Sequence, residues 1–571
     1  MDRKSIVGIA LAILVFVLAQ HQQLKHQRLN PAPATPSTSE TQASASPSAA
    51  PSAPETAAAT PAATPAPLEA APAATVPEET QVVGNGAVDY TFTNLGGGIA
   101  TLKLLNHQGA QPGERMVLNN GASHPIGALV LHPEKAPNTP YTVTVEGDQV
   151  ICETTVPPGI SVKKIYTLNR DPKAAYRLGL EVVFQNKSAG AVEYPAYYVF
   201  TGLAHLLYGS DVPMYIGFDY FAGHSNSFIT PDKFDAGRIP LIGIETSAAK
   251  PFYAQSPGNV LWAGVRNQYF TTMLLPEGTT GQGVWARQVP GKLDGHDVKG
   301  IEGFLEMPGF KLVPGETVRK NFTVYSGPAE LEALAALGSN ATAMTYIDRW
   351  WITRTVGTVL LRSMNALQGF LHSYAWAIIV LTFIVRGLLW PIQGRANRSM
   401  KRMQLLMPKQ TELRDKYKDD PARMNQEVMK LYKQYGVNPL SGCLPMLIQI
   451  PIFIGFYSML GTAVELRNSS FLWVHDLSRP DTIFHLAGFP VNILPIAMAL
   501  TMVWQMQLTP KAGDPSQQKI MMLMPLIFVV FTYNFASALA LYYTVQNLLS
   551  ILQLYVTRNQ PMPALEKAKK K

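Results

Sequence analysis

Hydrophobic residues follow two different patterns along this chain of 571 residues. From residue 81 to 326, apolar and polar residues alternate in runs such as VDYTFTNLGGGIATLKL and YTVTVEGDQVICETTV, and Gly, Pro, Asn and Asp separate the runs. This alternation is typical of antiparallel strands that bury one face. We therefore predict one large β-sandwich domain over residues 81–326.

The second pattern is a series of long apolar segments in the C-terminal part. Each is close to the roughly 20 residues that a helix needs to span a bilayer, although the fourth is short. The sequence NFAS before the fifth segment requires a tight turn. We predict a five-helix transmembrane core over residues 374–556, with spans at 374–392, 441–463, 487–507, 520–535 and 538–556.

The first 80 residues form two further regions. Residues 1–20 begin with Arg3 and Lys4 and continue as an apolar run, which fits a cleaved signal peptide and an uncleaved transmembrane anchor equally well. Residues 21–80 form a linker, and 42 of its last 50 residues are Pro, Ala, Ser or Thr. Such a segment buries too little apolar surface to fold, so we predict a disordered tether, with a glycosylated stalk as the alternative.

Residues 327–373 connect the β-sandwich to the core. They contain TYIDRWWITRTVG, in which Trp350 and Trp351 lie on an amphipathic stretch just before the first span. This arrangement favours a helix that lies in the membrane interface. The alternative is that the stretch forms the first turn of a long spanning helix.

Basic residues are distributed unequally between the loops of the core. The segment 393–440 holds eleven Lys or Arg against five acidic residues, and the tail 557–571 holds five more basic residues. The loop 465–482 holds only Arg467 and Arg479. Because basic loops stay in the cytoplasm, we predict a multi-pass membrane protein with both termini and the basic loop inside and the β-domain outside.

The basic segment 393–440 has a pattern of its own. It predicts two helices separated by DDP, with Pro421 in a first turn and Gly436 as a stop. Either this helical hairpin is simply solvated near anionic lipids, or it offers an adaptable surface to hydrophobic clients and ribosome-associated partners. The candidate residues for that surface are Met400, Met403, Met407, Met424 and Met429.

Arg386 interrupts the first span of the core, in TFIVRGLLWPIQ. A charge inside a span costs roughly 2.5–3.5 kcal/mol on insertion scales, so a chain that keeps one usually gives it water, a partner or a function. Arg386 lies about 9 Å from the cytoplasmic end, and Thr382 shares its helix face. Other polar residues occur in the spans, and we expect them to converge with Arg386 on a hydrated groove: Gln449, Tyr543, Gln546, Asn547, Ser550 and Gln553.

Several kinds of chemistry have no matching motif in this sequence. The five spans contain no Asp or Glu that could carry protons or sodium, and there is no GxxxxGKS or GxxxxGKT loop, HExxH or GxSxG. Only two cysteines occur, and the histidines lack ligand spacing. The stretch LGGGIA does not fit a nucleotide-binding loop and instead predicts a turn with close backbone approach. We therefore predict no catalytic residue, no metal and no cofactor.

The core sequence resembles the YidC family of bacterial membrane protein insertases. The resemblance covers about residues 350–556 and rests on TFIVRG, VNPLSGCLPMLIQIPIFIGFYSML, VELR, FLWVHDLS, DPSQQKIMMLMP and LALYYTVQNL, in that order. It implies an uncleaved first helix, a periplasmic β-supersandwich, and a five-helix core whose groove opens to cytoplasm and lipid. It also implies that Arg386 lines that groove. The linker and the last dozen residues match only in character.

The expected function is therefore that of an insertase and chaperone for transmembrane segments. It would act through a hydrophilic groove lined by Arg386, Thr382, Gln449, Tyr543 and Asn547, alone or with the Sec translocon. The expected partners are nascent membrane proteins, the Sec translocon, the ribosome or targeting factors at the basic hairpin and tail, and membrane lipids. The alternatives are a transporter of a small solute or lipid with a periplasmic binding domain, and a structural scaffold.

Overall fold

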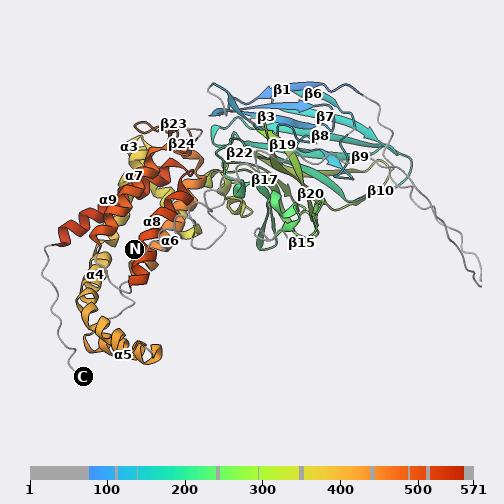
Figure 1. The fold of residues 1–571 in the computed structure, drawn as a ribbon. Coiled ribbons are helices and arrows are strands. Elements are labelled where there is room, and N and C mark those ends of the chain that lie inside the picture. The colour runs from blue at the N-terminus through green and yellow to red at the C-terminus, as the bar shows by residue number, and fades with distance from the viewer. Residues whose placement is uncertain are drawn as a thin grey trace, which may run out of the picture.

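The computed structural model describes most of the chain after the linker. The described residues are 76–558, except 110–112, 138, 239–244, 294, 346–352, 419, 438–443, 487–488 and 510–514. The anchor predicted for residues 1–20, the linker up to residue 75, Trp350, Trp351 and the tail from residue 559 lie outside them. The strands and the long helices occupy separate parts of the molecule (Figure 1).

The strands from β1 to β22 form a β-sandwich that agrees with the predicted domain. A nine-stranded antiparallel sheet packs through a shared core on a five-stranded sheet. In sheet order, the larger sheet contains β13 (Ser225–Ile229), β12 (Gly217–Ala222), β17 (Val260–Arg266), β18 (Phe270–Glu277), β22 (Thr317–Pro328), β9 (Arg177–Asn186), β8 (Ile160–Leu168), β7 (Gln149–Val156) and β6 (Thr142–Glu146). The smaller sheet contains β16 (Tyr253–Gln255), β19 (Gly283–Leu293), β20 (His296–Met307), β11 (Tyr197–Ala204) and β5 (Leu129–Val130).

Smaller elements complete this domain. A four-stranded sheet contains β1 (Thr80–Gly84), β2 (Val88–Thr93), β3 (Gly98–Gln108) and β4 (Arg115–Leu118). Two strand pairs join β10 (Val192–Tyr194) to β21 (Phe310–Leu312) and β14 (Gly237–Arg238) to β15 (Glu245–Ser247). Short 3₁₀ helices lie at η1 (Pro172–Ala174), η2 (Pro213–Tyr215) and η3 (Pro231–Phe234).

The alternation seen in the sequence explains how these strands pack. Along β9, Leu178, Leu180, Val182 and Phe184 are all buried, and the residues between them are more exposed. Strand β18, which lies two positions from β9 in the same sheet, is different, because its first six residues are buried on both faces. Its second face is covered by the helical segments after β22, namely α2 (Leu331–Ala335) and η4 (Ala341–Met344).

The LGGGIA stretch forms the predicted turn. Gly96 and Gly97 have φ angles of +78° and +55°, and a Cβ atom on Gly97 would lie 2.5 Å from the Tyr141 ring. Lys164, which is fully buried, holds the turn by donating hydrogen bonds from Nζ to the carbonyl oxygens of Gly96 at 2.7 Å and Gly97 at 3.1 Å. Glycine is required here because no side chain fits between the turn and the tyrosine ring.

The connection to the core contains a π-helical turn over Thr353–Gly357 and helix α3 (Thr358–Leu371). Helix α3 buries Leu360, Leu361 and Met364 against the core and leaves Phe370 exposed. It is therefore amphipathic, as expected for residues 327–373. Its location in the membrane interface remains a prediction.

Five core helices correspond to the five apolar segments. They are α4 (Tyr374–Lys416), α6 (Leu444–Thr462), α7 (Ile493–Leu508), α8 (Pro515–Thr532) and α9 (Ser537–Arg558). By length and composition α4 and α9 suffice to cross a membrane, and Ile448–Thr462 and Ile493–Leu508 are shorter apolar helices. The third segment was predicted to begin at residue 487, but its helix begins at Ile493. The residues before it form two strands, β23 (Thr482–Leu486) and β24 (Phe489–Asn492).

Helix α4 also continues beyond its apolar segment. It runs without a break through Pro391 and Pro408, so the first helix of the predicted hairpin is an extension of the span. The second is α5 (Pro421–Gln434), which lies at the end of the helical part that is farthest from the β-domain (Figure 1). Asp420 caps α5 by accepting a hydrogen bond from the Arg423 amide at 3.0 Å, and Gly436 follows it with φ +60°.

The β-domain meets the core at a seam that involves residues 207–215 and 266–270 on one side. On the other side are η8 (Val464–Leu466) and the loop up to residue 480. Arg467 donates hydrogen bonds to the Gln108 carbonyl oxygen at 3.1 Å and to the Tyr208 hydroxyl. Arg479 stacks on the Tyr208 ring, with its guanidinium carbon 3.8 Å from the ring centroid. In the sequence analysis Arg467 and Arg479 were only counted as the basic residues of loop 465–482. In the structure both contact the β-domain.

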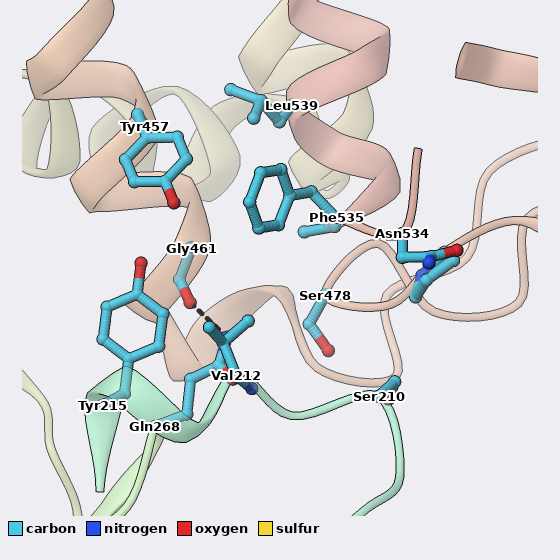
Figure 2. Close-up of a pocket in the computed structure, with 12 residues that line it drawn as sticks. Ser210, Val212, Tyr215, Gln268, Tyr457, Gly461, Ser478, Asn534, Phe535 and Leu539 are labelled. Carbon is cyan, nitrogen blue, oxygen red and sulfur yellow. Dashed lines mark hydrogen bonds between the residues drawn. The ribbon is translucent and has the colours of Figure 1, made fainter. Parts of the chain in front are cut away.

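A small cavity of about 20 Å³ lies in this seam. Figure 2 shows Tyr215 and Gln268 of the β-domain opposite Tyr457 and Gly461 of α6. The Gln268 side-chain amide donates a hydrogen bond to the Gly461 carbonyl oxygen at 2.6 Å. The volume suits about one water molecule, so the seam is closely packed.

Candidate functional site

Arg386 lies inside the helical core, with 7% of its surface exposed. Its Nη2 atom donates a hydrogen bond to the Ser550 Oγ atom of α9 at 2.6 Å. The Ser550 hydroxyl in turn donates to the Gln546 carbonyl oxygen at 2.8 Å. Among the described residues no carboxylate pairs with Arg386, and its Nε atom has no hydrogen-bond partner. The charge is therefore compensated there by a neutral hydroxyl only.

A second polar contact joins α6 to α9. The side-chain amide of Gln449 donates to the Gln546 Oε1 atom at 3.2 Å and lies 3.4 Å from the Tyr542 hydroxyl. Gln546 belongs to the turn of α9 that precedes Ser550. The contact therefore lies next to the Arg386 site along α9.

Two more contacts join α9 to α7 and to α4. The Asn547 side-chain amide donates to the Thr501 hydroxyl of α7 at 3.2 Å. The Gln553 side-chain amide donates to the Trp390 carbonyl oxygen of α4 at 3.1 Å. Helix α9 is thus the central element, and its polar residues reach three neighbouring helices. Gln546, Ser550 and Gln553 have i, i+4 and i+7 spacing, so these three residues lie on one face of α9.

Two of the predicted site residues have a different environment. Thr382 is buried, but its hydroxyl donates to the Ile378 carbonyl oxygen of its own helix at 2.6 Å. Tyr543 lies between aromatic rings, with centroid distances of 5.7 Å to Phe453 and 5.1 Å to Phe528. In this conformation Thr382 bonds within its own helix and Tyr543 makes ring contacts, and neither makes a polar contact between helices among the described residues.

The sequence argument did not find Tyr542 and Thr501. Adjacent tyrosines occupy positions 542 and 543, and helical spacing with Asn547 and Ser550 favoured the second. Tyr542 makes the polar contact with Gln449 and also stacks on Phe456 at 3.9 Å. Thr501 is a single threonine in an apolar segment and gave no signal in the sequence.

The methionines of the helical hairpin do not share one environment. Met403 packs against a small cluster formed by Leu406, Tyr432 and Val437, which holds α5 against α4. Met429 is exposed, whereas Met400, Met407 and Met424 are half-buried. The hairpin therefore uses some of these side chains for its own packing.

The described residues contain no cluster of three His, Cys, Asp or Glu side chains that could hold a metal ion. What the site offers is a buried guanidinium with several N–H donors, next to hydroxyl and amide groups on adjacent helices. Such a group binds carboxylate or other electron-rich oxygen atoms through charge-assisted hydrogen bonds. The site is thus suited to the recognition of such groups.

Comparison with known proteins identifies the family. The family model described as 60Kd inner membrane protein matches residues 366–564, and the YidC periplasmic domain matches residues 80–356. The membrane protein insertase YidC of Syntrophus aciditrophicus is 30% identical over 512 residues, which cover 85% of this chain and 86% of the relative. The chain belongs to the YidC family of membrane protein insertases. It is therefore a membrane protein, in which a periplasmic-type β-sandwich precedes the helical core.

Other relatives agree with this family. The membrane protein insertase YidC of Pelobacter propionicus is 31% identical over 520 residues, with 86% of this chain and 89% of the relative covered. A crystal structure of an active YidC insertase with its first transmembrane domain resolved is 21% identical and has a TM-score of 0.35. It covers 86% of this chain and 96% of its own. None of these relatives supports the transporter alternative.

Proposed function

We propose that this chain inserts transmembrane segments of client proteins into the membrane and assists their folding. Family membership supports this activity, and the observation that carries its mechanism is Arg386. A buried cation with a single neutral partner among the described residues is costly in an apolar region, so it is available to a client group of opposite charge.

In the proposed mechanism, a polar or acidic client segment enters from the cytoplasmic side and replaces Ser550 as a partner of Arg386. Gln449, Asn547 and Gln546 offer hydrogen bonds along the way, which shortens the apolar distance that the segment has to cross. Thr382 and Tyr543 line the groove only if α4, α6 and α9 separate from one another. The client then leaves sideways, because burial of its apolar surface in lipid is worth about 25 cal/mol per Å². No covalent step, metal or cofactor is needed.

The surroundings of the site supply the rest of the proposal. The helical hairpin with Met400, Met403, Met407, Met424 and Met429 receives the client, and the exposed Met429 is available without any rearrangement. The basic residues of segment 393–440 support a cytoplasmic location. The protein then lies in the bacterial inner membrane with both termini in the cytoplasm and the β-domain in the periplasm. It acts alone or with the Sec translocon, and the ribosome, targeting factors and anionic lipids are further partners.

Reconstitution of the purified full chain into liposomes tests the proposal. The client is a single-span protein with an acidic exported tail, and protection of that tail from protease reports insertion. We expect Arg386→Ala to reduce insertion strongly and Arg386→Lys to retain part of it. The matched control is Arg402→Ala, which removes an exposed arginine from the same helix. Full insertion of every tested client by Arg386→Ala would contradict the role of this charge.

A further inference from the structure

A β-hairpin between α6 and α7 exposes apolar side chains in an unusual way. It consists of β23 and β24, and every residue of β23 is exposed. The segment TIFHLAGFPVN contains no Asp, Glu, Lys or Arg. Its large apolar side chains are between 47% and 66% exposed, namely Ile483, Phe484, Leu486 and Phe489.

Among the described residues, hydrogen bonds with Tyr533 hold this β-hairpin at Pro490 and Asn492 of β24 and do not reach β23. The Tyr533 hydroxyl donates to the Pro490 carbonyl oxygen at 2.8 Å. The Thr482 hydroxyl donates to the Asn492 Oδ1 atom at 2.6 Å, and the Asn492 amide nitrogen Nδ2 donates to the Tyr533 carbonyl oxygen at 2.8 Å. Both contacts lie at the open end of the hairpin. A two-stranded hairpin is at best marginally stable in water, and uncovered apolar strands promote aggregation. The exposed apolar side chains beyond the base of the hairpin therefore need to be covered by another molecule or another part of the protein.

The helix that follows the β-hairpin is too short to cross the bilayer by itself. Helix α7 has 16 residues and is thus about 24 Å long, whereas the hydrocarbon core is about 30 Å thick. One side of α7 carries exposed apolar residues that include Ile493, Ile496 and Leu500. This row begins directly at the end of β24. The apolar surface of the hairpin therefore continues the lipid-facing surface of the helix.

Tryptophans near the β-hairpin indicate its depth. The Trp473 indole N–H donates to the Asp481 Oδ2 atom at 3.1 Å, one residue before β23 begins. Trp376, in the first turn of α4, is exposed and contacts the Phe471 ring edge-on at 6.0 Å. Exposed tryptophans are enriched where the membrane meets water. Figure 1 shows β23 and β24 next to the start of α7, at the end of the helical part that faces the β-domain.

We propose that this β-hairpin lies in the lipid interface of the leaflet on the β-domain side. Phe484, Leu486 and Phe489 contact the upper part of the acyl chains, and the strand edges face the headgroups. The strands remain at this depth because unpaired backbone N–H and C=O groups are not tolerated in the hydrocarbon core. The hairpin thus completes the membrane contact of the short helix α7. This inference does not depend on the insertase activity.

Site-directed spin labelling of the full chain in phosphatidylethanolamine–phosphatidylglycerol vesicles tests the proposal. One label is attached at Phe484→Cys or Leu486→Cys, in a chain that carries Cys152→Ala and Cys443→Ala. Leu500→Cys on α7 serves as the lipid-exposed reference, and Val313→Cys in the β-domain serves as the exposed aqueous reference. Collisions with oxygen and with a water-soluble nickel chelate are measured for each label, because oxygen concentrates in the acyl chains.

We expect the ratio of oxygen to nickel accessibility at positions 484 and 486 to exceed that at 313 severalfold and to remain below that at 500. A ratio equal to that at 313 would show that the hairpin lies in water and would overturn the proposal. Low accessibility to both reagents would overturn it in favour of a protein cover, such as residues 1–20 of this chain or a second protein. A Gly–Ser loop in place of residues 483–489 gives a second measure, and we expect it to lower the melting temperature in vesicles.

Discussion

The seam between the domains and the helical core each contain a buried arginine, and the two arginines have different surroundings. Arg467 at the seam is 9% exposed, and its guanidinium lies 4.6 Å from the Tyr208 ring and 5.2 Å from both the Tyr269 and Phe270 rings. The buried Asp211 is also close enough to interact with it electrostatically. Arg386 in the core has instead one serine hydroxyl among the described residues. Three aromatic rings, two hydrogen-bond acceptors and a nearby carboxylate surround Arg467, whereas Arg386 has a single hydroxyl acceptor among the described residues.

This difference separates a charge with a structural role from one that we propose to be functional. Cation–π contacts and a nearby carboxylate recover part of the solvation that Arg467 loses, so that arginine helps to hold two domains together. Arg386 recovers much less, and in the function proposed above an acidic client group would stabilise it further. Burial alone does not distinguish the two residues, but the chemistry of their partners does.

The largest effect is expected for Arg386→Met. We expect insertion to fall at least about tenfold, which corresponds to about 1.4 kcal/mol, while the thermal stability of the core stays the same or rises. The reason is that a buried charge with one partner costs more than an apolar side chain of similar size. Insertion assays and melting in vesicles measure the two quantities. A parallel loss of both would place Arg386 with Arg467 as a structural residue.

Arg467→Met should have the opposite profile. Loss of the aromatic contacts and of the bonds to Gln108 and Tyr208 should weaken domain docking by about 2–4 kcal/mol. Hydrogen exchange of the backbone amides in residues 207–216 measures docking, and we expect it to accelerate. Arg319→Met is the control, because Arg319 forms an exposed ion pair with Glu181 in the β-domain. Unchanged exchange in Arg467→Met would remove the contrast between the two arginines.

Asp211 should make the seam sensitive to pH. Burial raises the pKa of this carboxyl to about 6, although the Leu207 amide, Arg467 and the Tyr208 amide act in the opposite direction. Because the folded protein binds this proton more tightly than the unfolded chain does, the contribution of Asp211 to stability is complete below about pH 4 and is lost as the pH rises through 6. The change should be on the order of 2 kcal/mol. Hydrogen exchange at the seam between pH 4 and 7 measures it, and Asp211→Asn should show a flatter profile.

The smallest effect is expected for Asn547→Leu. The bond from Asn547 to Thr501 should contribute about 0.6 kcal/mol, the average for hydrogen bonds between helices in membranes. Thr501→Val removes the same bond from the other side. Melting of the two single variants and the double variant gives the coupling energy directly. A coupling above about 2 kcal/mol would show that this contact is as important as the seam.

The sequence predicted most of the β-domain and the number of core helices, because the apolar residues that an element buries recur at a spacing typical of a strand or a helix. It also singled out Arg386, Gln449 and Asn547, whose polarity is conspicuous in apolar segments and which make polar contacts between helices; their role in a client groove stays a prediction. It could not choose between Tyr542 and Tyr543, since adjacent residues differ by only about 100° around a helix and the choice depends on the neighbouring helices. The contacts of Arg467 could not be predicted from the sequence for a similar reason. Its aromatic partners lie about 200 residues or more earlier in the chain and meet it only when the domains dock.

The continuity of helix α4 gives the site a mechanical property. One helix of 43 residues, about 64 Å long, carries Arg386 in its membrane part and the packing surface for α5 near its other end. An α-helix transmits tilt and rotation along its axis. A displacement of α5 would therefore also tilt or rotate the part of α4 that carries Arg386. Pro391 lies between the two and is the natural place for a bend, because proline removes a backbone hydrogen bond. A movement of α5 would therefore reach Arg386 along one continuous helix, and a bend at Pro391 would absorb part of it.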